Sequence, residues 1–146
     1  MYDRSSTSSY TTTFTVDQTP AEVFAAINDV RGWWTGEIDG ATAAVGDEFT
    51  YRHGDVHYSK QRIIESSPGE RVVWLVVDAH LSFIADPGEW TGTEVTFDIV
   101  RAGGQTTLRF THVGLVPEVE CFDACSNAWG AYVSGGLRNR ITSGRG

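Results

Sequence analysis

Residues 117–140, PEVECFDACSNAWGAYVSGGLRNR, decide the fold of this chain, because they predict one amphipathic helix after a long run of strands. Pro117 suits a first helical position, and Glu118 and Glu120 place negative charge near the positive end of the helix dipole. Apolar side chains recur at three- and four-residue intervals on one face: Val119, Phe122, Cys125, Trp129, Tyr132, Val133 and Leu137. So broad an aromatic face needs a large surface to pack against. In this sequence that surface is the sheet formed by the preceding strands.

Those strands are predicted from the alternation of polar and apolar side chains. We expect them at residues 10–16, 49–53, 58–64, 72–77, 95–99 and 108–112. Gly54-Asp55 and Gly103-Gly104 are typical turns between paired strands. Residues 72–77 are almost continuously apolar, which favours a central strand covered on both faces. The sequence therefore predicts an antiparallel sheet with the long helix lying across one face.

Two short helices are expected directly after the first strand. Residues 19–22, TPAE, combine a cap residue, a proline at the first helical position and a glutamate three residues after the cap. This helix should end near Asn28. Asp29 is a candidate cap for a second short helix or turn that includes Trp33 and Trp34, and the glycines that follow predict a loop.

Two features leave alternatives open. Residues 78–93 predict either an irregular loop or an interrupted strand, because their apolar side chains are broken by an Asp-Pro-Gly sequence. Gly130, Gly135 and Gly136 each weaken a helix by about 1 kcal/mol relative to alanine. These glycines predict a bend, space above a cavity, or an early end to the long helix.

The 146 residues predict one domain, residues 10–146, after a disordered Ser/Thr-rich tail at residues 1–9. The formal charge of −8, with no run of Lys or Arg, argues against nucleic-acid and anionic-membrane partners. The chain shows no signal peptide and no apolar run of membrane-spanning length, so we expect a cytoplasmic protein. Cys121 and Cys125, four residues apart on one helix, are expected to be reduced thiols.

The order of these elements resembles the START-like, or SRPBCC, superfamily and its helix-grip fold, most closely the branch of the C-terminal domain of the heat-shock-protein ATPase activator. The resemblance covers residues 10–140. It rests on TPAEVF at 19–24, WW at 33–34, ESSPGERVVW at 65–74, EWTGT at 89–93 and LRFTHVGL at 108–115.

The resemblance implies an α+β fold in which a curved antiparallel sheet grips the C-terminal helix and encloses a hydrophobic cavity. It implies no single activity, because members bind lipids, plant metabolites or polyketides, act as cyclases, or contact a chaperone. It implies no cofactor.

Alternation along the strands and the helix predicts which side chains line that cavity. The expected ligand-binding residues are Trp33, Trp34, Phe49, Tyr51, Phe97, Phe110, His112, Phe122, Trp129 and Tyr132. His112 is the candidate catalytic residue, because an inward histidine can orient a ligand or act as an acid or base. The alternative is a core histidine bonded to a backbone carbonyl, or a family packing position. Trp33 and Trp34 are either an aromatic lid or one core and one half-exposed side chain.

Metal binding is not expected. His53 and His57 flank a turn that contains Asp55, but zinc requires three or four well-placed ligands. The sequence also contains no Gly-x-Ser-x-Gly nucleophile elbow, no Gly-rich phosphate loop and no dinucleotide fingerprint.

The function expected from these observations is binding of a small hydrophobic or aromatic ligand beneath the C-terminal helix, by a monomer or a homodimer. Two alternatives stay open. One is a cochaperone-like domain that contacts a heat-shock ATPase. The other is a polyketide cyclase-like, dehydratase-like or hydrolase-like enzyme that uses the same cavity.

Overall fold

The computed structural model describes residues 9–34, 36–82, 84–85, 88, 90–116 and 122–143. Its strands form one antiparallel sheet in the order β1-β7-β6-β5-β4-β3-β2. The strands are β1 (Tyr10–Val16), β2 (Glu37–Gly40), β3 (Glu48–His53), β4 (His57–Ser67), β5 (Arg71–Leu81), β6 (Glu94–Ala102) and β7 (Gln105–Val113). The helices are α2 (Pro20–Asn28), the 3₁₀ helix η1 (Val30–Gly32), α3 (Phe122–Trp129), the π-helical η2 (Gly130–Leu137) and α4 (Arg138–Ser143).

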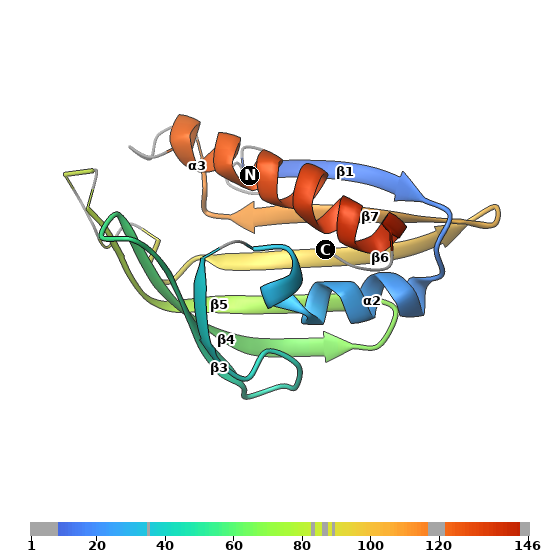
Figure 1. Ribbon diagram of the computed structural model, residues 1–146, viewed down its shortest axis with the longest axis horizontal. Coiled ribbons are helices and arrows are strands. Elements are labelled where there is room, and N and C mark those ends of the chain that lie inside the picture. Colours follow the sequence, from blue (N-terminus) through green and yellow to red (C-terminus); the bar gives the residue numbers. More distant parts are fainter. Residues whose placement is uncertain are drawn as a thin grey trace, which may run out of the picture.

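Figure 1 shows the C-terminal helix, made of α3, η2 and α4, lying across one face of the sheet with α2 beside its C-terminal end. The helix buries Cys125, Trp129, Val133, Leu137 and Ile141, which follow one another at intervals of four residues. The expected α+β architecture, a sheet that grips a long helix, is thereby confirmed. None of the helices in the described residues is long and apolar enough to cross a membrane.

The start of α2 follows the sequence signal closely. The Thr19 side chain accepts a hydrogen bond from the Glu22 backbone N–H, and the Glu22 side chain accepts one from the Thr19 N–H. The second short helix is present as η1, but Asp29 forms no side-chain cap hydrogen bond to it. The Asp29 carboxylate instead pairs with Arg140 of α4 and ties the two helical regions together.

Several boundaries differ from those expected. β2 was expected to be loop; it pairs with β3 as a short edge strand, because Gly40 lets the chain approach the Glu48 carbonyl closely. β5 continues to Leu81, which extends it into the segment left open as loop or strand. Residues 1–8, 117–121 and 144–146 lie outside the described residues, and with them all but Ser9 of the expected tail, the helix start at Pro117, and Cys121.

Among the three helix glycines, Gly136 has a specific packing role. A Cβ atom built on Gly136 would lie 2.8 Å from the Trp33 carbonyl oxygen, closer than real Cβ contacts, whereas one on Gly135 would meet nothing within 4 Å. The helix is continuous to Ser143, so the glycines do not end it early. Gly136 lets the helix backbone approach the segment that carries Trp33.

We expect Gly136→Ala to lower the free energy of unfolding by about 1–3 kcal/mol, because the helix or the Trp33 segment has to shift. Gly135→Ala is the matched control. It adds helix propensity in open space and should raise stability by about 0.5–1 kcal/mol. Urea unfolding of both variants measures the difference, and equal effects would contradict the proposed contact.

Candidate functional site

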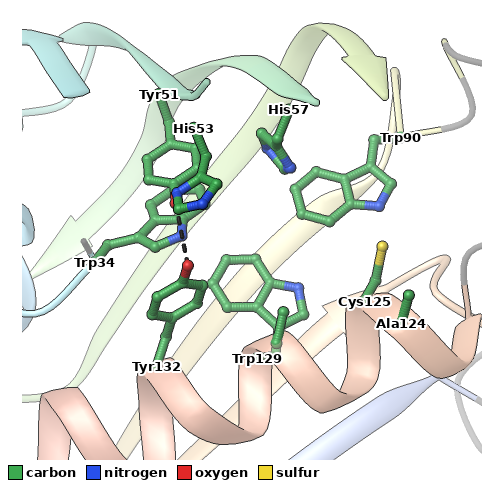
Figure 2. Close-up of a pocket in the computed structure, with 10 residues that line it drawn as sticks. Trp34, Tyr51, His53, His57, Trp90, Ala124, Cys125, Trp129 and Tyr132 are labelled. Atoms are coloured by element: carbon green, nitrogen blue, oxygen red, sulfur yellow. Dashed lines mark hydrogen bonds between the residues drawn. The ribbon is translucent and has the colours of Figure 1, made fainter. Parts of the chain in front are cut away.

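A pocket of about 150 Å³ opens between the C-terminal helix and the end of the β3–β4 hairpin. Figure 2 shows side chains from the hairpin on one side, side chains from the helix on the other, and Trp90 from the loop before β6 beside them. The lining residues are Trp34, Tyr51, His53, His57, Trp90, Ala124, Cys125, Ala128, Trp129 and Tyr132.

Aromatic rings form the walls of this pocket. The Trp34 and Tyr51 rings stack with centroids 3.9 Å apart, and the Trp90 and Trp129 rings are nearly parallel at 5.8 Å. Trp34 and Trp129 are 5.0 Å apart and connect the two pairs. The pocket therefore presents flat apolar ring surfaces to a ligand.

Two tyrosine hydroxyls supply one polar position in the pocket. The hydroxyl oxygens of Tyr51 and Tyr132 lie 3.3 Å apart, so the sheet and the helix are hydrogen-bonded across the cavity. Burial, and then the hydrogen bond to Tyr132, raise the pKa of Tyr51 above its usual value. Tyr51 therefore stays a neutral hydroxyl at physiological pH.

His57 supplies a second polar position. Its ring packs edge-on against Tyr51 and Trp90, at centroid distances of 5.0 and 4.8 Å, and its Nε2 lies 3.0 Å from the Ser59 hydroxyl. Burial, and then the neighbouring His53, lower the pKa of His57 to about 4. At neutral pH His57 is an uncharged group able to donate or accept a hydrogen bond.

His112 lies behind the pocket wall and joins three structural elements. The Trp129 indole N–H donates to His112 Nδ1 over 3.0 Å, and His112 Nε2 lies 2.8 Å from the Thr93 hydroxyl. The Thr93 hydroxyl itself donates to the Trp90 carbonyl at 2.6 Å, so it must accept from a protonated Nε2. We refer to this series of bonds, from Trp129 through His112 and Thr93 to Trp90, as the His112 chain.

The His112 chain assigns the neutral Nε2–H tautomer, and full burial lowers the pKa of His112 to about 3. His112 faces the helix, as expected, but it does not line the pocket and both ring nitrogens bond within the protein. Its burial matches the alternative of a core histidine, but its partners are the Trp129 indole and the Thr93 hydroxyl, not a backbone carbonyl. A direct catalytic role for His112 in this pocket has no support from its geometry.

The structure brings four of the ten expected ligand-binding residues into the pocket lining: Trp34, Tyr51, Trp129 and Tyr132. Phe49, Phe97, Phe110 and His112 are fully buried in the core, and Phe122 packs against it half-buried. Trp33 and Trp34 are both buried at 2% exposure, so neither tryptophan is half-exposed; Trp34 alone reaches the lining.

Sequence reasoning missed several lining residues as ligand contacts: His53, His57, Trp90, Ala124, Cys125 and Ala128. His53 and His57 do pair directly across the β3–β4 turn, as the Gly54-Asp55 signal suggested. That pairing, combined with the inward direction of Tyr51, could have placed both histidines at the pocket. Across the described ranges no three His, Cys, Asp or Glu side chains come together in a way that could hold a metal.

The fold matches several solved structures. The solution structure of the Aha1 dimer from Colwellia psychrerythraea is 22% identical, with 93% of this chain and 97% of that chain covered and a TM-score of 0.74. Mll3558 from Rhizobium loti is 18% identical over 87% of this chain and 92% of its own, with a TM-score of 0.67. DynU16, from the dynemicin biosynthetic locus, is 17% identical over 92% of this chain and 47% of its own, with a TM-score of 0.65.

These matches show the fold: an antiparallel sheet that grips a long C-terminal helix. A comparison with curated protein sequences finds no match. A family profile, that of the Activator of Hsp90 ATPase homolog 1-like proteins, matches residues 17–140. The chain belongs to this family.

The buried His112 and the partly buried His57 predict a pH-dependent stability. Unfolded histidine has a pKa of about 6.5, whereas His57 and His112 have folded-state pKa values of about 4 and about 3. Below pH 6.5 the unfolded chain therefore binds protons that the folded protein does not, and stability falls as pH falls.

Each of the two histidines should lower the free energy of unfolding by about 1.4 kcal/mol for each unit by which the pH falls, between about pH 6.5 and pH 4. Urea unfolding across that range measures the slope. His57→Phe keeps an aromatic ring in the same place. It should lower the slope of unfolding free energy against pH by the contribution of one proton, about 1.4 kcal/mol per pH unit. An unchanged slope in this variant would rule out the assignment to His57.

The His112 chain predicts the effect of removing a single oxygen. Thr93→Val keeps the side-chain shape but leaves the His112 Nε2–H without an acceptor, and should cost about 1–3 kcal/mol in stability. Thr107→Val is the control, because Thr107 bonds Thr15 at an exposed position. It should change stability by no more than about 0.5 kcal/mol. Thermal and urea unfolding of both variants provide the comparison.

Proposed function

We propose that the protein binds a small, planar, uncharged aromatic or apolar molecule in the pocket beneath its C-terminal helix. The observation that carries the proposal is the pair of flat aromatic walls, Trp34 on Tyr51 and Trp90 on Trp129, around an open cavity. Flat aromatic surfaces with a few polar groups are typical of small-molecule sites.

The size of the cavity limits the ligand. An apolar cavity of about 150 Å³ holds a benzene molecule, and this pocket has the same volume, about 150 Å³. A single ring with a short substituent therefore suits it as it stands. The Tyr51–Tyr132 hydroxyl pair and the His57 ring are the groups that can orient a hydroxyl or carbonyl substituent.

The charge of the pocket limits the ligand further. Among the described residues that line it there is no Asp, Glu, Lys or Arg. His57 is neutral at physiological pH because burial lowers its pKa to about 4, and burial raises the pKa of Tyr51. A charged ligand would lose hydration without gaining an ionic partner, so an uncharged molecule is favoured.

The proposal is tested by filling the cavity. Ala128 and Ala131 are both exposed on the C-terminal helix, but only Ala128 lines the pocket. We expect Ala128→Phe to weaken binding of p-cresol and indole at least tenfold in calorimetric titrations, and Ala131→Phe to change it less than twofold. Native mass spectrometry of the purified protein would identify any molecule that co-purifies.

If neither probe nor any other member of a broad apolar panel raises the melting temperature of the wild-type protein, ligand binding in this pocket is contradicted. Equal effects of the two alanine substitutions would place binding elsewhere on the protein.

A chaperone contact is a second candidate, favoured by the family match over residues 17–140. Such a contact would use the outer surface and would not depend on the cavity. Addition of this protein should then change the ATPase rate of an Hsp90-type chaperone, and Ala128→Phe should leave that change intact. An ATPase rate that stays constant at saturating protein would remove this candidate.

A further inference from the structure

A buried polar side chain lies on the floor of the fold beneath the aromatic pocket. On β4 the residues that face the helices are Ser59, Gln61 and Ile63, all at most 1% exposed. Gln61 lies between Phe49 of β3 and Val76 of β5, both of which are buried. Neither the Oε1 nor the Nε2 atom of Gln61 has a hydrogen-bond partner among the described residues.

A second buried polar atom without a partner belongs to the neighbouring strand. The indole Nε1–H of Trp74, on β5, is buried and also lacks a hydrogen-bond acceptor in the described part of the chain. Val76 is directly opposite Gln61, and Trp74 lies two residues further along the same face of β5. Diagonal neighbours of this kind are within reach of long side chains. The register therefore puts the Gln61 amide and the Trp74 indole on the same face of adjacent strands.

Buried polar groups in proteins are almost always hydrogen-bonded, and leaving them unpaired is costly. An apolar residue of similar size at position 61 would fill this part of the core without that cost. Gln61 instead offers a donor and an acceptor side by side, and a primary amide is the group that complements both at once.

Trp34 lies between this floor and the pocket. Its ring stacks at 3.9 Å on Tyr51 of β3 and at 5.9 Å on Trp74 of β5, so it passes over the inward side chains of β4, which lies between those strands. The same ring faces Trp129 and lines the pocket. Rotation of one side chain, Trp34, would join the pocket to the Gln61 floor.

We propose that Gln61 and the Trp74 N–H form a polar subsite for the carboxamide group of an aromatic ligand, which enters when the Trp34 side chain turns out of its stack. This inference rests on the proposed function and deepens it, because it names the ligand class as an aromatic primary amide larger than one ring. The ring of the ligand takes the place of the Trp34 ring, and its amide pairs with Gln61.

Two probes of matched shape test the subsite. 2-Naphthamide carries the amide, and 2-isopropenylnaphthalene replaces it with an apolar group of the same outline. We expect Gln61→Leu to weaken 2-naphthamide about tenfold, as loss of a paired buried hydrogen bond does, while the apolar probe keeps or gains affinity. In ¹H–¹⁵N spectra, 2-naphthamide should shift the Gln61 side-chain NH₂ and the Trp74 indole N–H.

A second variant covers the case in which Gln61→Leu does not fold. Trp34→Ala removes the cover from the floor, and we expect it to speed solvent exchange of the Gln61 NH₂ protons and to increase the affinity for 2-naphthamide. Unchanged exchange and affinity in this variant would overturn the inference.

The outcomes separate this inference from the proposed function. If both probes bind but Gln61→Leu affects neither and the two resonances do not move, the pocket binds ligands while Gln61 holds only a trapped water. The subsite is then wrong and the proposed function stands. If neither probe binds the wild-type protein, both fail.

Discussion

The hydrogen bond from the Trp129 indole to His112 is the constraint on which the site depends. A buried indole N–H requires an acceptor, and His112 provides one only in its neutral Nε2–H form. The Thr93 hydroxyl accepts a hydrogen bond from His112 Nε2–H and donates one to the Trp90 carbonyl. The helix, strand β7 and the loop before β6 are thus fixed to one another, and the parallel rings of Trp90 and Trp129 follow from it.

Charge is excluded from this interior by the same arrangement. A protonated His112 could not accept from Trp129, and a protonated His57 would place a cation among the rings of Trp34, Tyr51 and Trp90. Burial stabilises the neutral form of both histidines. The fold alone does not define a function, since related folds carry several. The neutral aromatic lining of the pocket is what narrows the class of ligand that we propose.

The fold could be predicted well from the sequence because its signals are local. The TPAE capping box at residues 19–22 needs only its own neighbours, and the Gly103-Gly104 turn sets the β6–β7 register directly. The long helix was recognisable because Cys125, Trp129, Val133 and Leu137 repeat at helical spacing. Strand β2 was not predicted because it has four residues, of which Ile38 is the only apolar one.

The site was only partly predictable because its contacts join distant segments. Trp90 has no periodic neighbours, and only the tertiary fold brings it against Trp129. On β4 the apolar side chain of Ile64 points outward, at 40% exposure, while Gln61 points inward. The polarity of the β4 side chains therefore indicates the wrong buried face. Two register shifts in the β4–β5 pairing also make the strand hard to predict from alternation.

All five tryptophans of the chain belong to one connected set of ring contacts, from Trp33 through Trp74 and Trp34 to Trp129 and Trp90. Neighbouring centroids in this series are 5.0–6.2 Å apart. At such separations excitation energy passes between indoles faster than it is emitted. The intrinsic fluorescence and the near-ultraviolet circular dichroism of the protein are therefore collective properties of the cluster. A change at any one ring alters the signal of all five.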